Sequence, residues 1–251
     1  MNNTILINLL LSHLIVDFYL QSNSTCDHKI EKGFKSWFLY LHALLAGVLS
    51  WTLICSSEFW KYALLIFLSH LLIDGSKALL SGYFIHKKEG QADYKQPISN
   101  FALFSIDQIL HIAIIGFVSF FYKDQFWNIF SICSDKWAFN VPLTILMFLL
   151  CLKPANIIIK LVLVEYKIGL SSDCEEIKNA GALIGDLERI LTLVFVILGK
   201  YEAVGFLIAA KSILRFRDTH TAKTEYVLAG TFLSFGIAIL CGIIAAWAWE
   251  K

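Results

Sequence analysis

Long apolar runs separated by short polar segments make up most of the chain. Runs of about 17–25 apolar residues are long enough to cross a bilayer as a helix. The first four predicted membrane helices cover about residues 4–20, 37–55, 60–80 and 101–122. A fifth begins near Phe139 and is broken at Pro154, because proline has no backbone N–H to donate. The last predicted helix covers about residues 226–249.

The apolar block at residues 182–214 is too long for one ordinary span of about 20 residues. Its centre is interrupted by the polar sequence Gly199-Lys200-Tyr201-Glu202. We therefore favour a hairpin of two short helices, at about residues 183–198 and 203–214. With the hairpin the chain has eight membrane segments, and with one continuous span it has seven.

Lysines are concentrated in the polar segments 21–36 and 82–100. Short loops rich in Lys and Arg lie on the cytoplasmic side of membrane proteins. Both segments are therefore predicted to be cytoplasmic, with the N-terminus outside a bacterial cytoplasmic membrane. The hairpin also returns Arg215 and Arg217 to the cytoplasmic side, as the same rule requires.

Composition supports an integral membrane protein. Hydrophobic residues make up 57% of the chain and charged residues only 16%, whereas soluble domains carry about 25% charged residues. Because backbone polar groups must form hydrogen bonds inside lipid, we predict an all-α polytopic bundle of seven to eight membrane segments.

A net charge of +1 gives no basic surface for nucleic acid. Two domains are predicted, at residues 1–125 and 126–251.

Three pairs of histidine and aspartate stand four residues apart inside the predicted helices. Residues at positions i and i+4 share one face of a helix, so each pair can direct two ligand groups to one point. Ionisable side chains are costly inside a membrane and commonly mark a functional site. The pairs, with a single further histidine, are His13 and Asp17, His70 and Asp74, Asp107 and His111, and His42.

The topology places these seven groups at related depths in the cytoplasmic half of one four-helix domain. Imidazole and carboxylate groups suit Zn²⁺, Mn²⁺ or Fe²⁺, and Zn or Mn is the predicted cofactor. Seven groups exceed one tetrahedral site. The alternatives are two metals, or one metal whose imidazole ligands are oriented by the remaining carboxylates. Asp17, Asp74 and Asp107 are candidate ligands or general bases, and Lys77 shares the His70 face, where it could hold an anionic group.

A second charged group lies in or beside the block at residues 182–214. It consists of Glu188, Arg189, Lys211 and Arg215. In the hairpin, Glu188 and Lys211 lie at similar depth and could pair. The group is interpreted as a structural ion pair that holds the hairpin, or alternatively as a site for an anion or a lipid headgroup.

The segments HLIVDFYLQ, LHALLAG, SHLLIDGSK and DQILH resemble the DUF3307 family of bacterial membrane proteins. Two C-terminal blocks, GALIGDLERILTLVFVILGKYEAVGFLIAAKSILRF and EYVLAGTFLSFGIAIL, are similar to the same group. The His/Asp pattern of the first half also resembles the LexA-regulated, membrane-bound metal-dependent hydrolases. That second resemblance implies hydrolysis of a lipid-borne ester or phosphodiester.

Three functions are compatible with these observations. The first is a metal-dependent hydrolase whose substrate reaches the His/Asp group from the lipid bilayer. The second is a proton-coupled transporter or channel that uses the same residues as a proton relay. The third is a membrane effector or anchor for a soluble cytoplasmic partner. The chain has no nucleotide-binding, GxSxG or HExxH motif that would favour another chemistry.

Overall fold

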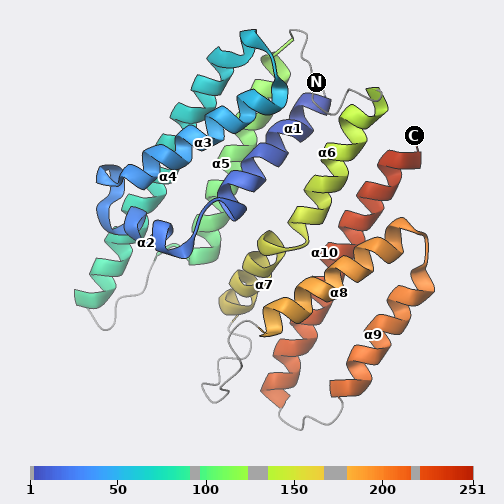
Figure 1. The fold of residues 1–251 in the computed structure, drawn as a ribbon. Coiled ribbons are helices and arrows are strands. Elements are labelled where there is room, and N and C mark those ends of the chain that lie inside the picture. Colours follow the sequence, from blue (N-terminus) through green and yellow to red (C-terminus); the bar gives the residue numbers. More distant parts are fainter. Residues whose placement is uncertain (1–2, 91–96, 124–134, 167–179, 216–220, 251) are drawn as a thin grey trace. The chain divides into compact units, whose positions relative to one another are not determined.

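A computed structural model describes residues 3–90, 97–123, 135–166, 180–215 and 221–250. All regular elements in these ranges are helical (Figure 1), as the sequence predicts. The chain divides into two compact units, Met1–Pro142 and Leu143–Lys251. The predicted domain boundary, between residues 125 and 126, lies outside the described residues.

The first unit holds four long helical segments and a short helix between the first two. In chain order its elements are α1 (Asn3–Leu14), the π-helical turn η1 (Ile15–Tyr19), α2 (Asn23–Lys32), η2 (Gly33–Lys35), α3 (Trp37–Ile54), η3 (Ser57–Phe59), α4 (Trp60–Gly90) and α5 (Asn100–Phe121). Helix α1 packs against α3 and α5, and α4 also packs against α3 and α5. Ile5, Leu9 and Val16 are fully buried in the apolar core between these helices.

The elements of the second half are α6 (Asp135–Leu150), α7 (Lys153–Glu165), α8 (Ala180–Ile197), α9 (Tyr201–Arg215) and α10 (Thr221–Glu250). Pro154 lies in the first turn of α7, where a missing N–H costs no helical hydrogen bond. The axes of α6 and α7 differ by 42°, so the predicted kink is present.

Within the described ranges, α3, α4, α5 and α10 are each long and apolar enough to span a membrane. Two bent pairs raise the number to as many as six: α1 with α2, bent by 86°, and α6 with α7. This range of four to six is smaller than the seven or eight segments predicted. The difference comes from the block at 182–214, where α8 carries three charged residues and α9 has only 15 residues.

The break inside the 182–214 block is present, and α8 and α9 form a helical hairpin (Figure 1). Gly199 has φ +67, a left-handed backbone conformation that glycine adopts without steric cost. The turn is closed by a backbone hydrogen bond of 2.8 Å from Lys200 N to Phe195 O.

Two polar segments predicted as loops contain helical residues within the described ranges. Segment 21–36 contains α2, whose start has a capping box formed by Ser22 and Thr25. Helix α4 extends to Gly90, ten residues beyond the predicted end at Leu80. His28 and His86 therefore lie on helices, and His220 lies outside the described residues.

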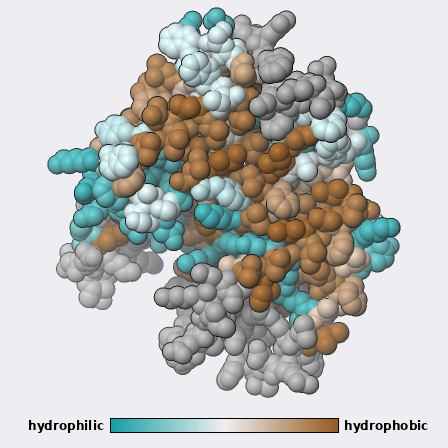
Figure 2. Space-filling view, viewed as in Figure 1, coloured by the Kyte–Doolittle hydropathy of each residue, from teal (hydrophilic) through white to brown (hydrophobic). Residues whose placement is uncertain are grey.

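Large apolar side chains are exposed along the outer faces of the helices, as expected for contact with lipid. On α3 they include Leu44 and Val48, and on α4 they include Leu68 and Leu72. Figure 2 shows hydrophobic residues over much of the visible described surface. The helix lengths and this surface together identify an integral membrane protein.

Gly82 allows α4 to approach α2 closely. A Cβ atom at this position would lie 2.8 Å from the backbone oxygen of Ile30, which cannot rotate away. Gly82→Ala is therefore expected to separate the two helices and to destabilise the protein by about 1–3 kcal/mol. Thermal unfolding in detergent measures the effect.

Gly116→Ala is the matched control, because a Cβ atom there meets no atom within 4 Å apart from its chain neighbours and the nearby backbone of its own helix. The control should unfold at or slightly above the wild-type temperature, since alanine favours a helix over glycine. Equal unfolding temperatures for Gly82→Ala and wild type would contradict the close contact between α2 and α4.

Candidate metal centre

The first unit brings all seven predicted His and Asp side chains together. They come from α1 and η1 (His13 and Asp17), α3 (His42), α4 (His70 and Asp74) and α5 (Asp107 and His111). The Asp17 side chain is 10% exposed, and the other six residues are buried. Three overlapping groups of them each have ligand atoms within 4.8 Å of one another: His13, Asp17 and His70; His42, His70 and Asp74; Asp17, Asp107 and His111.

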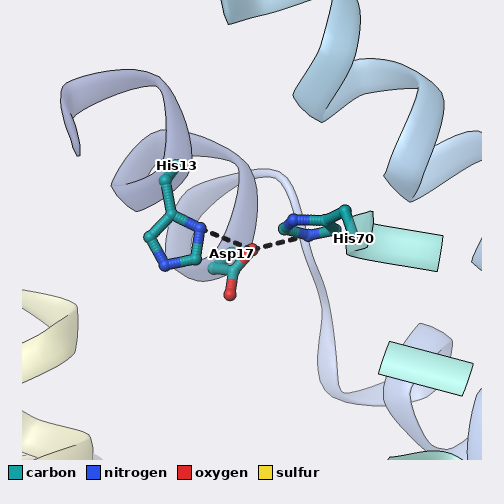
Figure 3. A group of neighbouring side chains, drawn as sticks. All are labelled: His13, Asp17 and His70. Carbon is teal, nitrogen blue, oxygen red and sulfur yellow. Dashed lines mark ion pairs between the residues drawn. The ribbon is translucent and has the colours of Figure 1, made fainter. Parts of the chain in front are cut away.

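One oxygen of Asp17 is surrounded by three imidazole nitrogens. Asp17 Oδ1 lies 3.1 Å from His70 Nε2, 3.4 Å from His42 Nε2 and 3.6 Å from His13 Nδ1. Figure 3 shows His13 and His70 on either side of this carboxylate. His42 Nε2 and His70 Nε2 are themselves 3.1 Å apart.

These four separations fit the edges of a metal coordination polyhedron. Zinc binds nitrogen and oxygen ligands at about 2.0–2.1 Å, so two ligand atoms of a tetrahedral site lie about 3.3–3.4 Å apart. The four separations, 3.1–3.6 Å, lie close to this value. His13, Asp17 and His70, whose ligand atoms lie within 4.8 Å of one another, could therefore hold one divalent ion, and His42 Nε2 lies beside Asp17 and His70 as a further candidate ligand.

Gln108 fixes the tautomer of a neutral His13. Its amide Nε2 donates to Asp17 Oδ2 and to Asp107 Oδ2, each at 3.1 Å. Its Oε1 therefore accepts from His13 Nε2 at 3.2 Å, which leaves the lone pair of a neutral His13 on Nδ1. His13 Nδ1 and Asp17 Oδ1 then meet as two buried acceptors, and neither makes a hydrogen bond of good geometry, although His70 Nε2 lies 3.1 Å from Asp17 Oδ1. A cation between them would satisfy both.

His111 presents a second free lone pair. His111 Nδ1 lies 2.9 Å from the backbone oxygen of Asp107, so Nδ1 carries the proton and donates it. Nε2 of a neutral His111 is consequently an acceptor, and it has no hydrogen-bond partner. Asp107 Oδ1 also has none, while Asp107 Oδ2 accepts from Lys77 Nζ at 2.7 Å. An imidazole fixed in this tautomer by its other nitrogen is typical of metal ligands.

Two lysines hold the outer carboxylates. Lys77 binds Asp107, and its side chain is 37% exposed. Lys29 is buried and donates to Asp74 Oδ2 at 2.7 Å and to Gln21 Oε1 at 2.9 Å. With neutral imidazoles, three carboxylates and two ammonium groups leave the cluster with one net negative charge. A divalent cation would reverse this sign.

Lys29 and Gln108 also belong to the site, although no sequence motif contains them. Lys29 was interpreted as a topology-determining charge in a cytoplasmic loop, and nothing in the sequence separates it from Lys32 or Lys35. Only the bend between α1 and α2 brings it to Asp74. Gln108 is identifiable from the sequence as a candidate site residue, because it is a polar residue next to Asp107 inside an apolar helix.

A small cavity of about 10 Å³ adjoins the imidazoles of His13, His70 and His111. This volume holds about one water molecule. Ser50 and Ser69 contribute to its wall, and the remainder is apolar. The cavity provides space beside the candidate ligands for one small group.

The charged residues of α8 and α9 form separate contacts in the second unit. Lys211 pairs with Glu188. Arg189 is 2% exposed and pairs with Asp186 at 2.6 Å; it also donates to Asn156 Oδ1, Ser234 Oγ and the backbone oxygen of Cys151. Arg215 ends α9, and its side chain lies outside the described part of the structure.

A family model described as protein of unknown function (DUF3307) matches residues 5–140, which is more than half of the chain and includes every residue of the candidate metal centre. No curated protein and no solved structure matches the chain. The resemblance of the C-terminal blocks to this family, and that of the first half to the LexA-regulated hydrolases, stay predictions from the sequence. The chain belongs to the DUF3307 family.

Proposed function

We propose that this protein binds a divalent metal ion within the membrane and hydrolyses a lipid-borne ester or phosphodiester. The observation that carries the proposal is the convergence of His13, His42 and His70 on Asp17 Oδ1 at 3.1–3.6 Å. Buried polar groups normally have hydrogen-bond partners. His13 Nδ1 and Asp17 Oδ1 lack them, which favours a bound cation over a purely structural polar network.

Hydrolysis is supported by the surroundings of the proposed ligands. A bound divalent ion supplies Lewis-acid chemistry and makes a coordinated water molecule more acidic. The cavity beside His13 and His70 has room for about one water molecule. Asp74 Oδ2 lies 3.3 Å from His42 Nε2, which makes it a further carboxylate near the proposed ion, and Asp107 Oδ1 is available as a proton acceptor. Lys77, the most exposed polar group of the cluster, would offset negative charge on an anionic substrate.

A lipid substrate would come from the bilayer, which the apolar outer surface of the helices contacts. We place the protein in a bacterial cytoplasmic membrane with its N-terminus outside, on the distribution of lysines. This orientation puts the metal centre in the cytoplasmic half of the membrane, where headgroups of that leaflet could reach Lys77.

Metal content is the direct test. Protein purified without chelators and dialysed after exposure to Zn²⁺ or Mn²⁺ is expected to retain at least one ion per chain. His70→Gln should lose this ion, because it removes a ligand shared by two of the three groups. His86→Gln makes the same change on an exposed part of α4 and should retain it. Elemental analysis by mass spectrometry gives the stoichiometry, and metal-free wild type at excess metal would refute the proposal.

Substrate turnover is tested in lipid nanodiscs of phosphatidylglycerol and phosphatidylethanolamine. We expect metal-loaded wild type to release products that mass spectrometry detects, and a chelator to stop the release. Proton flux in liposomes, abolished by His70→Gln and unaccompanied by lipid hydrolysis, would favour the transporter alternative instead.

A further inference from the structure

We infer that the centre holds two divalent ions bridged by Asp17, and that its substrate carries a phosphoryl group. The inference rests on the proposed metal-binding function and extends it to a second site. The first ion takes the three imidazoles around Asp17 Oδ1. The second takes Asp17, Asp107 and His111, whose ligand atoms lie within 4.8 Å of one another.

Unpartnered lone pairs support the second site. Asp107 Oδ1 and His111 Nε2 are both buried without a hydrogen-bond partner, and both side chains are at most 3% exposed. Asp107 Oδ2 already accepts hydrogen bonds from Lys77 and Gln108, so Oδ1 is the oxygen left to bind a metal. Moving the proton of His111 from Nδ1 to Nε2 would break the hydrogen bond from Nδ1 to the Asp107 backbone oxygen. Nε2 therefore keeps its lone pair.

The two sites are close enough to share a ligand. The rings of His111 and His70 have centroids 4.2 Å apart, and those of His111 and His13 are 5.0 Å apart. Ligands of the first ion are therefore in ring contact with a ligand of the second. Two-metal hydrolytic sites have ions about 3.5–4 Å apart. Asp17 is shared by the group of His13, Asp17 and His70 and by the group of Asp17, Asp107 and His111.

Charge defines the class of substrate. The cluster has one net negative charge with neutral imidazoles, from three aspartates and the paired Lys29 and Lys77. Two divalent ions would change this to three net positive charges in a buried site. Such a charge requires anionic ligands. A phosphoryl ester supplies negative charge at the reacting group, whereas a carboxylic ester does not, so the two-ion centre selects phosphoryl substrates.

Stoichiometry and magnetic coupling test the pair of ions. Wild type titrated with Mn²⁺ is expected to bind two ions per chain, and its electron paramagnetic resonance spectrum should show exchange coupling instead of the six lines of isolated Mn²⁺. Asp107→Asn with His111→Gln should reduce the content to one ion and restore the six-line signal. Ser105→Ala, on the same helix, is the control and should keep both ions.

The outcomes separate this inference from the proposed function. One uncoupled ion per wild-type chain would overturn the second site and leave metal binding intact, whereas no bound ion would overturn both. The wild-type spectrum decides the question even if the double variant fails to fold. Inorganic phosphate should bind at least tenfold more tightly to the Mn²⁺-loaded protein than to the metal-free protein. Equal binding would overturn the phosphoryl assignment.

Discussion

Asp17→Asn is expected to remove both ions from the centre at once. The carboxylate lies within 3.6 Å of three imidazoles and also belongs to the Asp107 and His111 group. Loss of residues that merely orient metal ligands already weakens binding about 10–100-fold, so removing the shared ligand should weaken it by about 100-fold or more. Mn²⁺ titration followed by electron paramagnetic resonance measures the loss.

Asp27→Asn is the matched control for this variant. It makes the same chemical change on an exposed position of α2, outside the cluster. We expect it to bind both ions as wild type does. A second comparison is Asp74→Asn, which removes a carboxylate held by Lys29 but leaves Asp17 in place; it should weaken binding less than Asp17→Asn. Retention of both ions by Asp17→Asn would contradict a bridging carboxylate.

Arg189→Met is expected to have the largest effect on the stability of the second unit. The guanidinium is almost fully buried and donates to Asp186 on its own helix, Asn156 on α7, Ser234 on α10 and the backbone oxygen of Cys151 in the turn between α6 and α7. Asp186 is 29% exposed and can be hydrated, so the main cost is the loss of hydrogen bonds to the buried acceptors, about 1–3 kcal/mol for each one left without a partner. Detergent-induced unfolding followed by tryptophan fluorescence gives the free-energy change.

Lys160→Met controls for the loss of a cation, since Lys160 is exposed on α7. Its effect should be below about 0.5 kcal/mol. Lys211→Met provides an intermediate case, because its pair with Glu188 is partly exposed, at 17% and 15% of the two side chains. If Arg189→Met were no more destabilising than Lys160→Met, the buried network would not be holding these helices together.

Much of the fold and most of the candidate site follow from local patterns. The apolar runs predict α3, α5 and α10 to within a few residues, because a membrane helix needs a minimum apolar length. The four-residue spacing of His13 and Asp17, and of Asp107 and His111, identifies residues that share one face. The convergence of all four helices needed one further assumption, that they form a single bundle.

The remaining features depend on tertiary contacts. Helix α2 is polar and has no long apolar run, so hydropathy gives no signal for it. The position of Lys29 depends on the 86° bend after α1, which local sequence does not encode. In the described residues, four to six helices or bent pairs are long and apolar enough to span, and α8, which contains Asp186, Glu188 and Arg189, is not among them.

The π-helical turn Ile15–Tyr19 contains Asp17 and positions its carboxylate. The geometry of the candidate metal centre is therefore sensitive to insertions and deletions in this turn. A π-helix holds one more residue per turn than an α-helix and occurs mostly as single turns at functional sites. Deleting one residue between His13 and Asp17 would remove the extra residue that the π-turn accommodates and shorten their spacing from four residues to three. We expect the length of this turn to be preserved among DUF3307 proteins that keep the His/Asp set. A one-residue gap in an alignment would then mark members that have lost the metal centre.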